Sequence, residues 1–245
     1  MRRIERAGRR LAYALDAGRP PTIVFLPGLR SDMRGAKALA LREAAAAWGV
    51  AMLRLDYAGH GASDGRFEDG CIGDWAADAL AVIEATTAGR LILVGSSMGG
   101  WIGLLLARRL SHRVAGFVGI AAAPDFTETM IRPALTAAQR QALERDGRFE
   151  VPNAYGDKLS ITRRLIEDGA RNLVLGTSIP LACPVRLLQG QQDTDVPWQT
   201  ALTLAERIES PDVQVVLIKD GDHRLSREAD LALLTGTLAA ILPAT

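Results

Sequence analysis

Cysteines and long apolar runs are scarce in this sequence. Its two cysteines, Cys71 and Cys183, stand far apart, without a CxxC pair or histidines at metal-ligand spacing. This pattern argues against a zinc site or a disulfide framework. We expect packed thiols in a reducing compartment, with no metal and no cofactor. No apolar run approaches the roughly 20 residues that a membrane span needs, so we expect a soluble protein.

An excess of charge of one sign is also missing. Lys plus Arg number 29 and Asp plus Glu number 28, which gives a formal net charge of +1. No basic stripe is available to neutralise phosphates, so nucleic acid is not an expected partner. The arginine-rich N-terminus contains Glu5 and Asp16 and no serine, unlike a transit peptide. We therefore predict a cytoplasmic location.

What the sequence does contain is a regular alternation of short β-rich runs and longer helical stretches. The 245 residues, 48% of them hydrophobic, suffice for one main domain. We predict strands at residues 10–15, 22–26, 50–56, 91–94, 114–121, 185–189 and 213–218. We predict helices at residues 36–48, 72–86, 98–110, 198–209 and 228–242. This alternation predicts an α/β fold with a mostly parallel, doubly wound sheet, in which functional residues gather where strands end.

One segment, residues 127–180, breaks this rhythm. It holds no convincing strand, and its composition predicts helices and loops. A long insertion of this kind is usually functional or disordered, and its apolar residues can fold over something: Leu135, Leu143, Leu159, Ile161, Leu165 and Ile166. We predict a small helical cap at 127–180, inserted after the strand near 114–121, in a core made of 1–126 and 181–245.

The strongest chemical signal is a G-x-S-x-G motif between a predicted strand and a predicted helix. Residues 91–100 read LILVGSSMGG, which places Ser97 on the connecting turn. Gly95 and Gly99 flank it because side chains there would collide where strand and helix approach. Taken alone, the motif fits a simple Gly-Ser turn as well, so a serine nucleophile needs further residues in support.

A nucleophilic serine needs a general base, and the chain has three histidines: His60, His112 and His223. His60 lies in a glycine-rich loop before the serine, where a bracing role fits better. His112 follows the charged end of a helix and is expected at the surface. His223 follows the last predicted strand, where a loop presents its ring at the carboxyl edge of the sheet. We predict that His223 is the base.

The acid that orients the base is expected between serine and histidine in chain order. The loop after the strand at 185–189 offers Asp193, our choice, and Asp195, which chemistry alone does not exclude. Asp222 is adjacent to His223, and its side chain should point away from the imidazole. For Asp195 and Asp222, stabilisation of a turn is the simpler interpretation.

An oxyanion hole requires two preorganised donors. The N–H of Met98, at the start of the helix after the motif, should supply one of them. Pro27 and Gly28 turn the backbone inward after the strand at 22–26, so we assign the second donor to the N–H of Leu29.

These motifs resemble the α/β-hydrolase superfamily, and in particular its palmitoyl-protein thioesterase and acyl-glucuronide esterase branch. The resemblance covers most of the chain and lies in FLPG at 25–28, LDYAGHGASDG at 55–65, GSSMGGW at 95–101, DTDVPW at 193–198 and DHR at 222–224, with GRFEVP at 147–152 and IP at 179–180. It implies Ser97, Asp193 and His223 as a triad and selects Asp193 over Asp195, because the acid there lies three residues before Val-Pro.

Together, these residues predict a serine hydrolase that cleaves ester or thioester bonds through an acyl-enzyme. The expected substrate is a small acyl ester, an acyl glucuronide or an acylated protein. A generic carboxylesterase and a non-catalytic ligand-binding protein of the same fold are the alternatives. Trp101, Leu135 and Ile161 are candidates for an acyl pocket, but such residues are more often core, and we leave them out of the predicted site. Nothing in the sequence indicates the oligomeric state.

Overall fold

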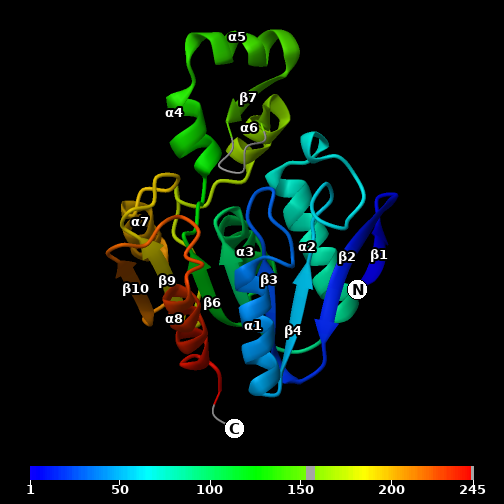
Figure 1. The fold of residues 1–245 in the computed structure, drawn as a ribbon, viewed down its shortest axis with the longest axis vertical. Coiled ribbons are helices and arrows are strands. Elements are labelled where there is room, and N and C mark those ends of the chain that lie inside the picture. Colours follow the sequence, from blue (N-terminus) through cyan, green and yellow to red (C-terminus); the bar gives the residue numbers. More distant parts are fainter. Residues whose placement is uncertain (153–157, 244–245) are drawn as a thin grey trace.

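A computed structural model describes residues 1–152 and 158–243 of the chain. Within these ranges, eight strands form one sheet in the order β1-β2-β4-β3-β5-β6-β9-β10 (Figure 1). The strands are β1 (Arg2–Arg6), β2 (Arg9–Asp16), β3 (Arg19–Leu26), β4 (Val50–Leu55), β5 (Leu91–Ser96), β6 (Val114–Ile120), β9 (Val185–Gly190) and β10 (Val213–Ile218). In this order, β4, β3, β5, β6, β9 and β10 are parallel to their neighbours among these six. The pairs β1–β2 and β2–β4 are antiparallel. The predicted fold class is confirmed.

Helices cover both faces of this sheet, which is why its central strands are apolar on both sides. In β5, Ile92 and Val94 pack in a cluster with α1 (Ala36–Ala47) and α8 (Glu228–Ala239). Leu91 and Leu93 face the opposite cluster, to which the helices of the other face belong. Those helices are α2 (Ile72–Thr86), α3 (Met98–Arg109) and α7 (Gln199–Arg207). A short 3-10 turn, η1 (Phe67–Asp69), precedes α2.

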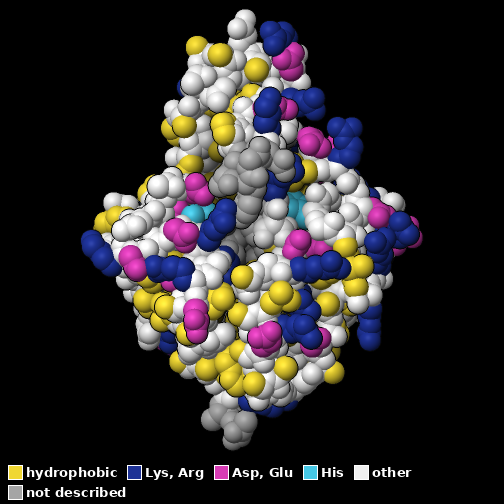
Figure 2. Space-filling view, viewed as in Figure 1, with side chains coloured by type: hydrophobic (Ala, Val, Ile, Leu, Met, Phe, Trp, Pro, Cys, Tyr) yellow, Lys and Arg dark blue, Asp and Glu magenta, His cyan; other side chains and the backbone are white. Residues whose placement is uncertain are grey.

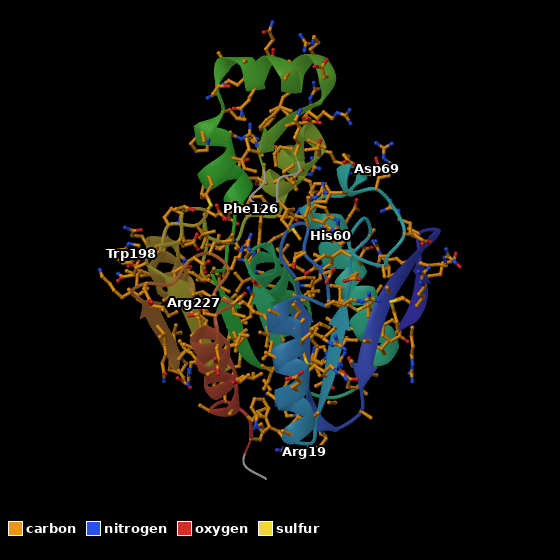
Figure 3. All side chains as sticks on the ribbon, in the orientation of Figure 1. Arg19, His60, Asp69, Phe126, Trp198 and Arg227 are labelled. Atoms are coloured by element: carbon orange, nitrogen blue, oxygen red, sulfur yellow. The ribbon has the colours of Figure 1, made fainter. Side chains whose placement is uncertain are left out.

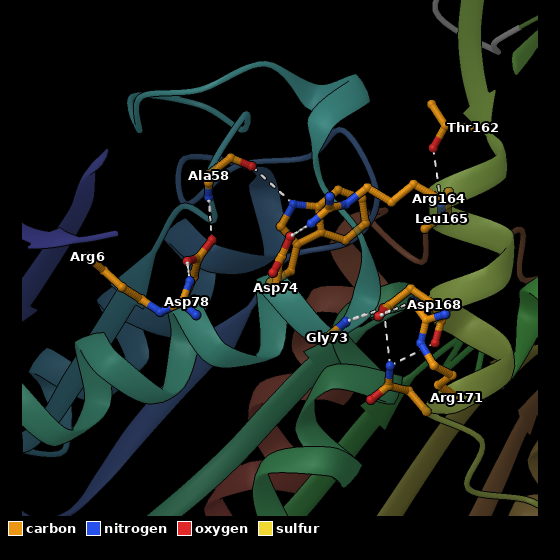
Figure 4. A network of polar contacts seen from close by, with 12 residues as sticks. Arg6, Ala58, Gly73, Asp74, Asp78, Thr162, Arg164, Leu165, Asp168 and Arg171 are labelled. Atoms are coloured by element: carbon orange, nitrogen blue, oxygen red, sulfur yellow. Dashed lines mark hydrogen bonds and ion pairs between the residues drawn. The ribbon is translucent and has the colours of Figure 1, made fainter. Parts of the chain in front are cut away.

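The first strand escaped the prediction. In β1, Arg2–Arg6, most side chains are exposed, because the strand lies at the edge of the sheet and pairs only with β2. Charged edge strands carry no apolar run that a sequence pattern would reveal. Arg6 instead pairs with the buried Asp78 of α2, at 2.5 Å between Nη1 and Oδ1 (Figure 4).

The expectation that residues 127–180 hold only helices and loops was wrong. The segment contains η2 (Thr127–Ile131), α4 (Arg132–Ala134), α5 (Ala137–Asp146), β7 (Arg148–Pro152), β8 (Lys158–Thr162) and α6 (Arg163–Arg171). Strands β7 and β8 form an antiparallel pair in which Phe149 lies opposite Ile161, and both side chains are buried. The strands were missed because they are short and only every second residue is apolar.

The 127–180 segment stands over the carboxyl edge of the sheet (Figure 1). Its division from the rest as a cap on a core of 1–126 and 181–245 stays a prediction, and residues 153–157 and 244–245 lie outside the described ranges. Polar contacts tie α6 to the start of α2 (Figure 4): Asp168 accepts the Gly73 N–H at 2.7 Å, and Arg164 pairs with Asp74 at 2.6 Å.

The two ends of the segment are tied to each other. The carboxylate of Asp125, which is 3% exposed, accepts the backbone N–H groups of Val174 and Leu175 at 2.8–3.1 Å. The indole N–H of Trp101 donates to the Asn172 carbonyl at 2.9 Å. Phe126 lies next to Asp125, at the junction between the segment and the body of the protein (Figure 3). The chain therefore leaves and re-enters the body at one place.

Candidate active site

Ser97 lies on the tight turn between β5 and α3. Its φ of 52° is in the left-handed region, which non-glycine residues seldom occupy and which costs of the order of 1–3 kcal/mol. The turn is held because Ser97 N–H donates to the Ile120 carbonyl at 2.9 Å, and the Ser97 carbonyl accepts from Gly100 and Ala123. A side chain at Gly99 would overlap with the backbone of Leu26. The glycine thus allows α3 to start close to the sheet.

The structure brings Ser97, His223 and Asp193 together from the ends of three strands. Ser97 follows β5, Asp193 follows β9 and His223 follows β10. The His223 Nε2 atom lies 3.1 Å from Ser97 Oγ, and His223 Nδ1 lies 2.8 Å from Asp193 Oδ2. With the proton on Nδ1, Nε2 is left to accept the serine hydroxyl. The three side chains thus form one hydrogen-bonded chain.

Asp193 is fixed from several sides. Its side chain is fully buried, and it accepts the N–H groups of Asp195 and Val196 at 2.8 Å and the Gln189 amide at 2.9 Å. Burial acts to raise the pKa of Asp193, but the hydrogen bonds from His223 and Val196 outweigh it and hold the pKa below its usual value. The carboxylate is therefore kept charged beside the imidazole.

The competing acids make other contacts, as their turn-forming context suggested. Asp195 is exposed, and its backbone N–H donates to Asp193. The Asp222 carboxylate accepts the N–H of Leu225 at 2.9 Å, which is a turn within its own loop. The histidine selected from the sequence, His223, is therefore paired with Asp193 and with neither alternative.

The other two histidines are not near the serine. His112 is exposed after α3. His60 is 3% exposed and lies edge-on to the rings of Tyr57, Phe67 and Trp75, with Nδ1 3.3 Å from the Ala58 carbonyl. Burial lowers the pKa of His60 to about 4. It is therefore a neutral core histidine in the body of the protein (Figure 3).

The loop after β3 approaches the serine, where Leu29 N–H was predicted as an oxyanion donor. A Cβ added to Gly28 would lie 3.3 Å from the Ser97 Cβ, so the backbone passes next to the hydroxyl. Leu29 and Met98 line the same cavity as Ser97. The loop is fixed because the Tyr57 hydroxyl donates to the Pro27 carbonyl at 3.2 Å. The role of the two N–H groups as an oxyanion hole stays a prediction.

A cavity of about 590 Å³ opens at the serine. The core contributes Ser97, His223, Lys37 and the loop after β3. The 127–180 segment contributes an apolar wall made of Met130, Ile131, Ala134, Leu135, Phe149, Val151, Leu159 and Ile161. Leu135 and Ile161, which we left out of the predicted site, line this cavity, whereas the fully buried Trp101 does not.

Sequence reasoning missed the residues that hold the site in place. Besides Gln189 on Asp193, it missed Asp56, whose carboxylate accepts the N–H groups of Met33 and Ala62 at 2.8 Å and so joins two loops. The available signal was position, because Asp56 and Gln189 both lie at the carboxyl end of a strand of the sheet.

Charge and hydrophobicity of the surface give no single dominant patch. On the face drawn in Figure 2, basic and acidic side chains are interspersed over the body and the 127–180 segment. Among the described residues, no helix has the length and apolar character to span a bilayer. Nor do the described ranges contain a group of three or more His, Cys, Asp or Glu side chains placed to hold a metal ion.

The fold and the arrangement of Ser97, His223 and Asp193 define a class of protein. Residues 23–235 match the alpha/beta hydrolase family, and the chain belongs to that family. The coarser part of the functional prediction, an enzyme of the hydrolase type, is therefore confirmed.

One relative in sequence and two solved structures show to which members of the family the chain is similar. The chain is 40% identical over 230 residues to the mouse protein named palmitoyl-protein thioesterase ABHD10, mitochondrial, which covers 93% of this chain and 77% of that relative. The solved structure of mouse alpha/beta hydrolase domain-containing protein 10 has a TM-score of 0.90 at 38% identity, covering 98% of this chain and 97% of that one. A putative hydrolase from Agrobacterium vitis S4 gives 0.95 at 43% identity, with coverage of 98% and 97%. The predicted resemblance to the thioesterase branch is confirmed.

The comparison also corrects one expectation. The mouse, rat and bovine relatives, at 39–40% identity, are all named mitochondrial proteins. These names point to mitochondria, and the cytoplasmic location predicted from the sequence was therefore wrong. That prediction rested on the composition of the N-terminal residues, which form β1 and β2 of the sheet.

Proposed function

We propose that the protein is a serine hydrolase that cleaves ester and thioester bonds, with Ser97 as nucleophile, His223 as base and Asp193 as orienting acid. The observation that carries the proposal is the hydrogen-bonded chain from Asp193 through His223 to Ser97, at 2.8 and 3.1 Å. This chain ends at a cavity with an apolar wall. A nucleophile, a base and an orienting group in that order are the requirement for acyl transfer.

The mechanism has two half-reactions. In the first, Ser97 Oγ attacks the acyl carbonyl carbon while its proton passes to His223 Nε2, and the Leu29 and Met98 N–H groups stabilise the oxyanion. The tetrahedral intermediate expels the alkoxide or thiolate, which takes the proton from the imidazolium. In the second, water gives a proton to His223 as it attacks the acyl-enzyme; the new tetrahedral intermediate expels the Ser97 oxygen, which takes the proton from the imidazolium, and the carboxylic acid is released. Asp193 stabilises the imidazolium throughout.

The substrate class follows from the cavity and the relatives. We propose that the 127–180 segment acts as a cap and that its wall binds an apolar acyl chain. The leaving group is a thiol or an alcohol, including the sugar hydroxyl of an acyl glucuronide. Two observations support this class: the apolar side chains along the segment's side of the cavity, and the relatives named palmitoyl-protein thioesterase.

Hydrolysis of a matched panel of acyl esters and acyl thioesters of increasing chain length tests the proposal. Ser97→Ala should lower kcat by about 10⁶, as loss of a triad serine does. Ser178→Ala, the same substitution at an exposed serine beside Glu209, serves as control and should leave kcat unchanged. Turnover that survives in Ser97→Ala would show that the nucleophile is assigned wrongly.

The same panel tests the bond type. We expect the wild type to cleave both the thioester and the oxygen ester of one acyl chain. Thioester cleavage at the rate of the enzyme-free blank, with rapid p-nitrophenyl ester cleavage, would reduce the proposal to a carboxylesterase. An intact, folded wild type that neither turns over the panel nor reacts with a fluorophosphonate would contradict the enzymatic proposal altogether.

A further inference from the structure

Lys37 occupies a position that its own helix does not favour. It lies in the first turn of α1, where the helix dipole is positive and a cation is unfavourable. That turn holds no acidic residue to compensate. The contacts that stabilise the Lys37 ammonium lie outside α1.

Those contacts are made with the loop that carries His223. Lys37 Nζ donates to the backbone carbonyl of Arg224, and Arg224 directly follows His223. The same Nζ lies 3.4 Å from Ser226 Oγ. The Ser226 hydroxyl donates to the same carbonyl at 2.9 Å. The side chain of Lys37, far away in the sequence, thus holds the backbone of the loop that carries His223 by a hydrogen bond.

This loop needs support from outside. Leu225 has a φ of 42°, a left-handed conformation that a leucine adopts only when its surroundings impose it. Within the loop, the Leu225 N–H donates to Asp222 Oδ1 at 2.9 Å, in addition to the bond from the Ser226 hydroxyl to the Arg224 carbonyl. The Leu225 side chain is also buried. Lys37 adds a restraint on the carbonyl that precedes the strained residue.

The charges around Lys37 keep it protonated near neutral pH. The lysine is half-buried, and burial lowers its pKa to about 8. The carboxylates of Asp222 and Asp230 act in the opposite direction, and the guanidinium of Arg224 again lowers the pKa. The ammonium therefore carries its full hydrogen-bonding strength at pH 7 and loses it under mildly alkaline conditions.

We propose that Lys37 is a positioning residue, which holds the loop at His223 so that the imidazole stays in line with Ser97. The inference rests on the proposed function, because it gives His223 the role of base. Misplacement of a catalytic group by about 1 Å costs about 100-fold in rate. A restraint one residue away from the imidazole is well placed to prevent such a shift.

A different role would leave a different kinetic signature. Lys37 also lines the cavity, so a substrate contact is the competing explanation. A substrate contact would raise KM selectively for anionic leaving groups. A positioning role would lower kcat equally for neutral and anionic leaving groups and leave KM nearly unchanged.

The experiment compares Lys37→Met with the wild type and with Lys219→Met, the same substitution at an exposed lysine after β10. Two readouts are used: kcat and KM on neutral and anionic leaving groups, and the rate at which a fluorophosphonate reacts with Ser97. For Lys37→Met we expect kcat and the phosphonylation rate to fall together by about 10- to 100-fold. Lys219→Met should match the wild type, and thermal unfolding confirms that each variant is folded.

A second measurement is the pH dependence of kcat, which tests Lys37 in the wild type itself. In the wild type, kcat should fall as the pH rises through about 8, where Lys37 loses its proton, and Lys37→Arg should remove that fall. If the wild type reacts through Ser97 and Lys37→Met reacts as fast, or if only KM changes, the inference is wrong while the proposed function stands. If the wild type does not react with the fluorophosphonate, both fall together.

Discussion

Two regions face each other across the cavity, and they differ in how deeply their elements are buried. One is made of the loops at the ends of β5, β9 and β10, and the other is the 127–180 segment. The loops that carry Ser97, Asp193 and His223 follow strands of one sheet, and β5 and β9 are buried along their whole length. In the segment, helices α4 and α5 have no buried residue. The first side is therefore held by the core throughout, whereas in the segment α6, with its buried Leu165 and Ile166, packs into the core and α4 and α5 do not.

This contrast separates reactivity from selectivity. Asp193 has hydrogen-bond partners on both carboxylate oxygens, so its geometry cannot change without breaking several bonds. The cavity wall in the segment depends on apolar side chains that make no directional contact. We therefore expect substitutions on the sheet side to alter rate, and substitutions on the segment side to alter which acyl chain is accepted.

After the loss of Ser97 itself, the largest effect should come from the acid. Asp193→Asn keeps the shape of the side chain but removes the charge that fixes the imidazole, and kcat should fall by about 10⁴. Asp195→Asn, two residues away on an exposed side chain, is the matched control and should stay close to the wild type. Steady-state hydrolysis of one ester measures both. If Asp195→Asn were the slower variant, the acid would be assigned to the wrong residue.

Acid unfolding of the body should depend on His60. Its pKa is about 4 in the folded protein, against 6.5 in the unfolded chain, so the unfolded state binds more protons between these values. The contribution of neutral His60 to the free energy of unfolding is fully present above pH 6.5. It is lost as the pH falls to 4, which lowers the stability by about 3 kcal/mol. His60→Leu should weaken this dependence, measured by urea unfolding at pH 7 and pH 4.5.

His112→Leu, at an exposed histidine, provides the control for that measurement. A pH dependence of unfolding that is the same in His60→Leu and His112→Leu would show that burial of His60 does not contribute to acid lability.

The junction of the two regions should respond locally. Asp125→Ala leaves the buried N–H groups of Val174 and Leu175 without their acceptor, and we expect a loss of about 2 kcal/mol in stability. Hydrogen exchange should accelerate within 127–175 and not in β5. Asp146→Ala, at an exposed aspartate paired with Arg145 on the surface, should change stability by less than about 0.5 kcal/mol. Faster exchange throughout the sheet would erase the proposed contrast between the two regions.

The smallest effect should come from the cavity wall. Leu135→Ala removes apolar surface from the segment side, and kcat/KM for long acyl chains should fall by about 10-fold. Acetyl esters, which do not reach the wall, should be hardly affected. Leu39→Ala, at an exposed leucine of α1, controls for the substitution itself. An equal loss on acetyl and long-chain esters would show that the segment influences rate and not selectivity.

The central, parallel part of the sheet was predictable because its strands are largely apolar runs, unlike the charged edge strand β1. β10 occupies the predicted residues 213–218, and α2 the predicted residues 72–86. The three residues proposed as a triad could be selected for a related reason: each lies in the loop after such a strand, and the G-x-S-x-G motif indicates the first of them. Strand order brings together side chains that the chain separates by more than a hundred residues.

The rest of the site depends on contacts that no local pattern encodes. Strands β7 and β8 are short and alternate apolar and polar side chains, so their pairing emerges only when Phe149 meets Ile161. Lys37 and Ser226 are 189 residues apart, and a lysine in a first helical turn is an unfavourable position that sequence rules do not reward. Supporting residues of this kind become visible only in three dimensions.

The bond pair between Asp125 and residues 174–175 has a consequence for protein engineering. Because the chain leaves and returns at one place, an insertion with the same end-to-end spacing can be exchanged there if it also replaces the buried Leu165 and Ile166, through which α6 packs into the core. A library of foreign inserts grafted between Asp125 and Val174 would then vary the acyl preference, while the residues proposed as the reaction centre stay the same.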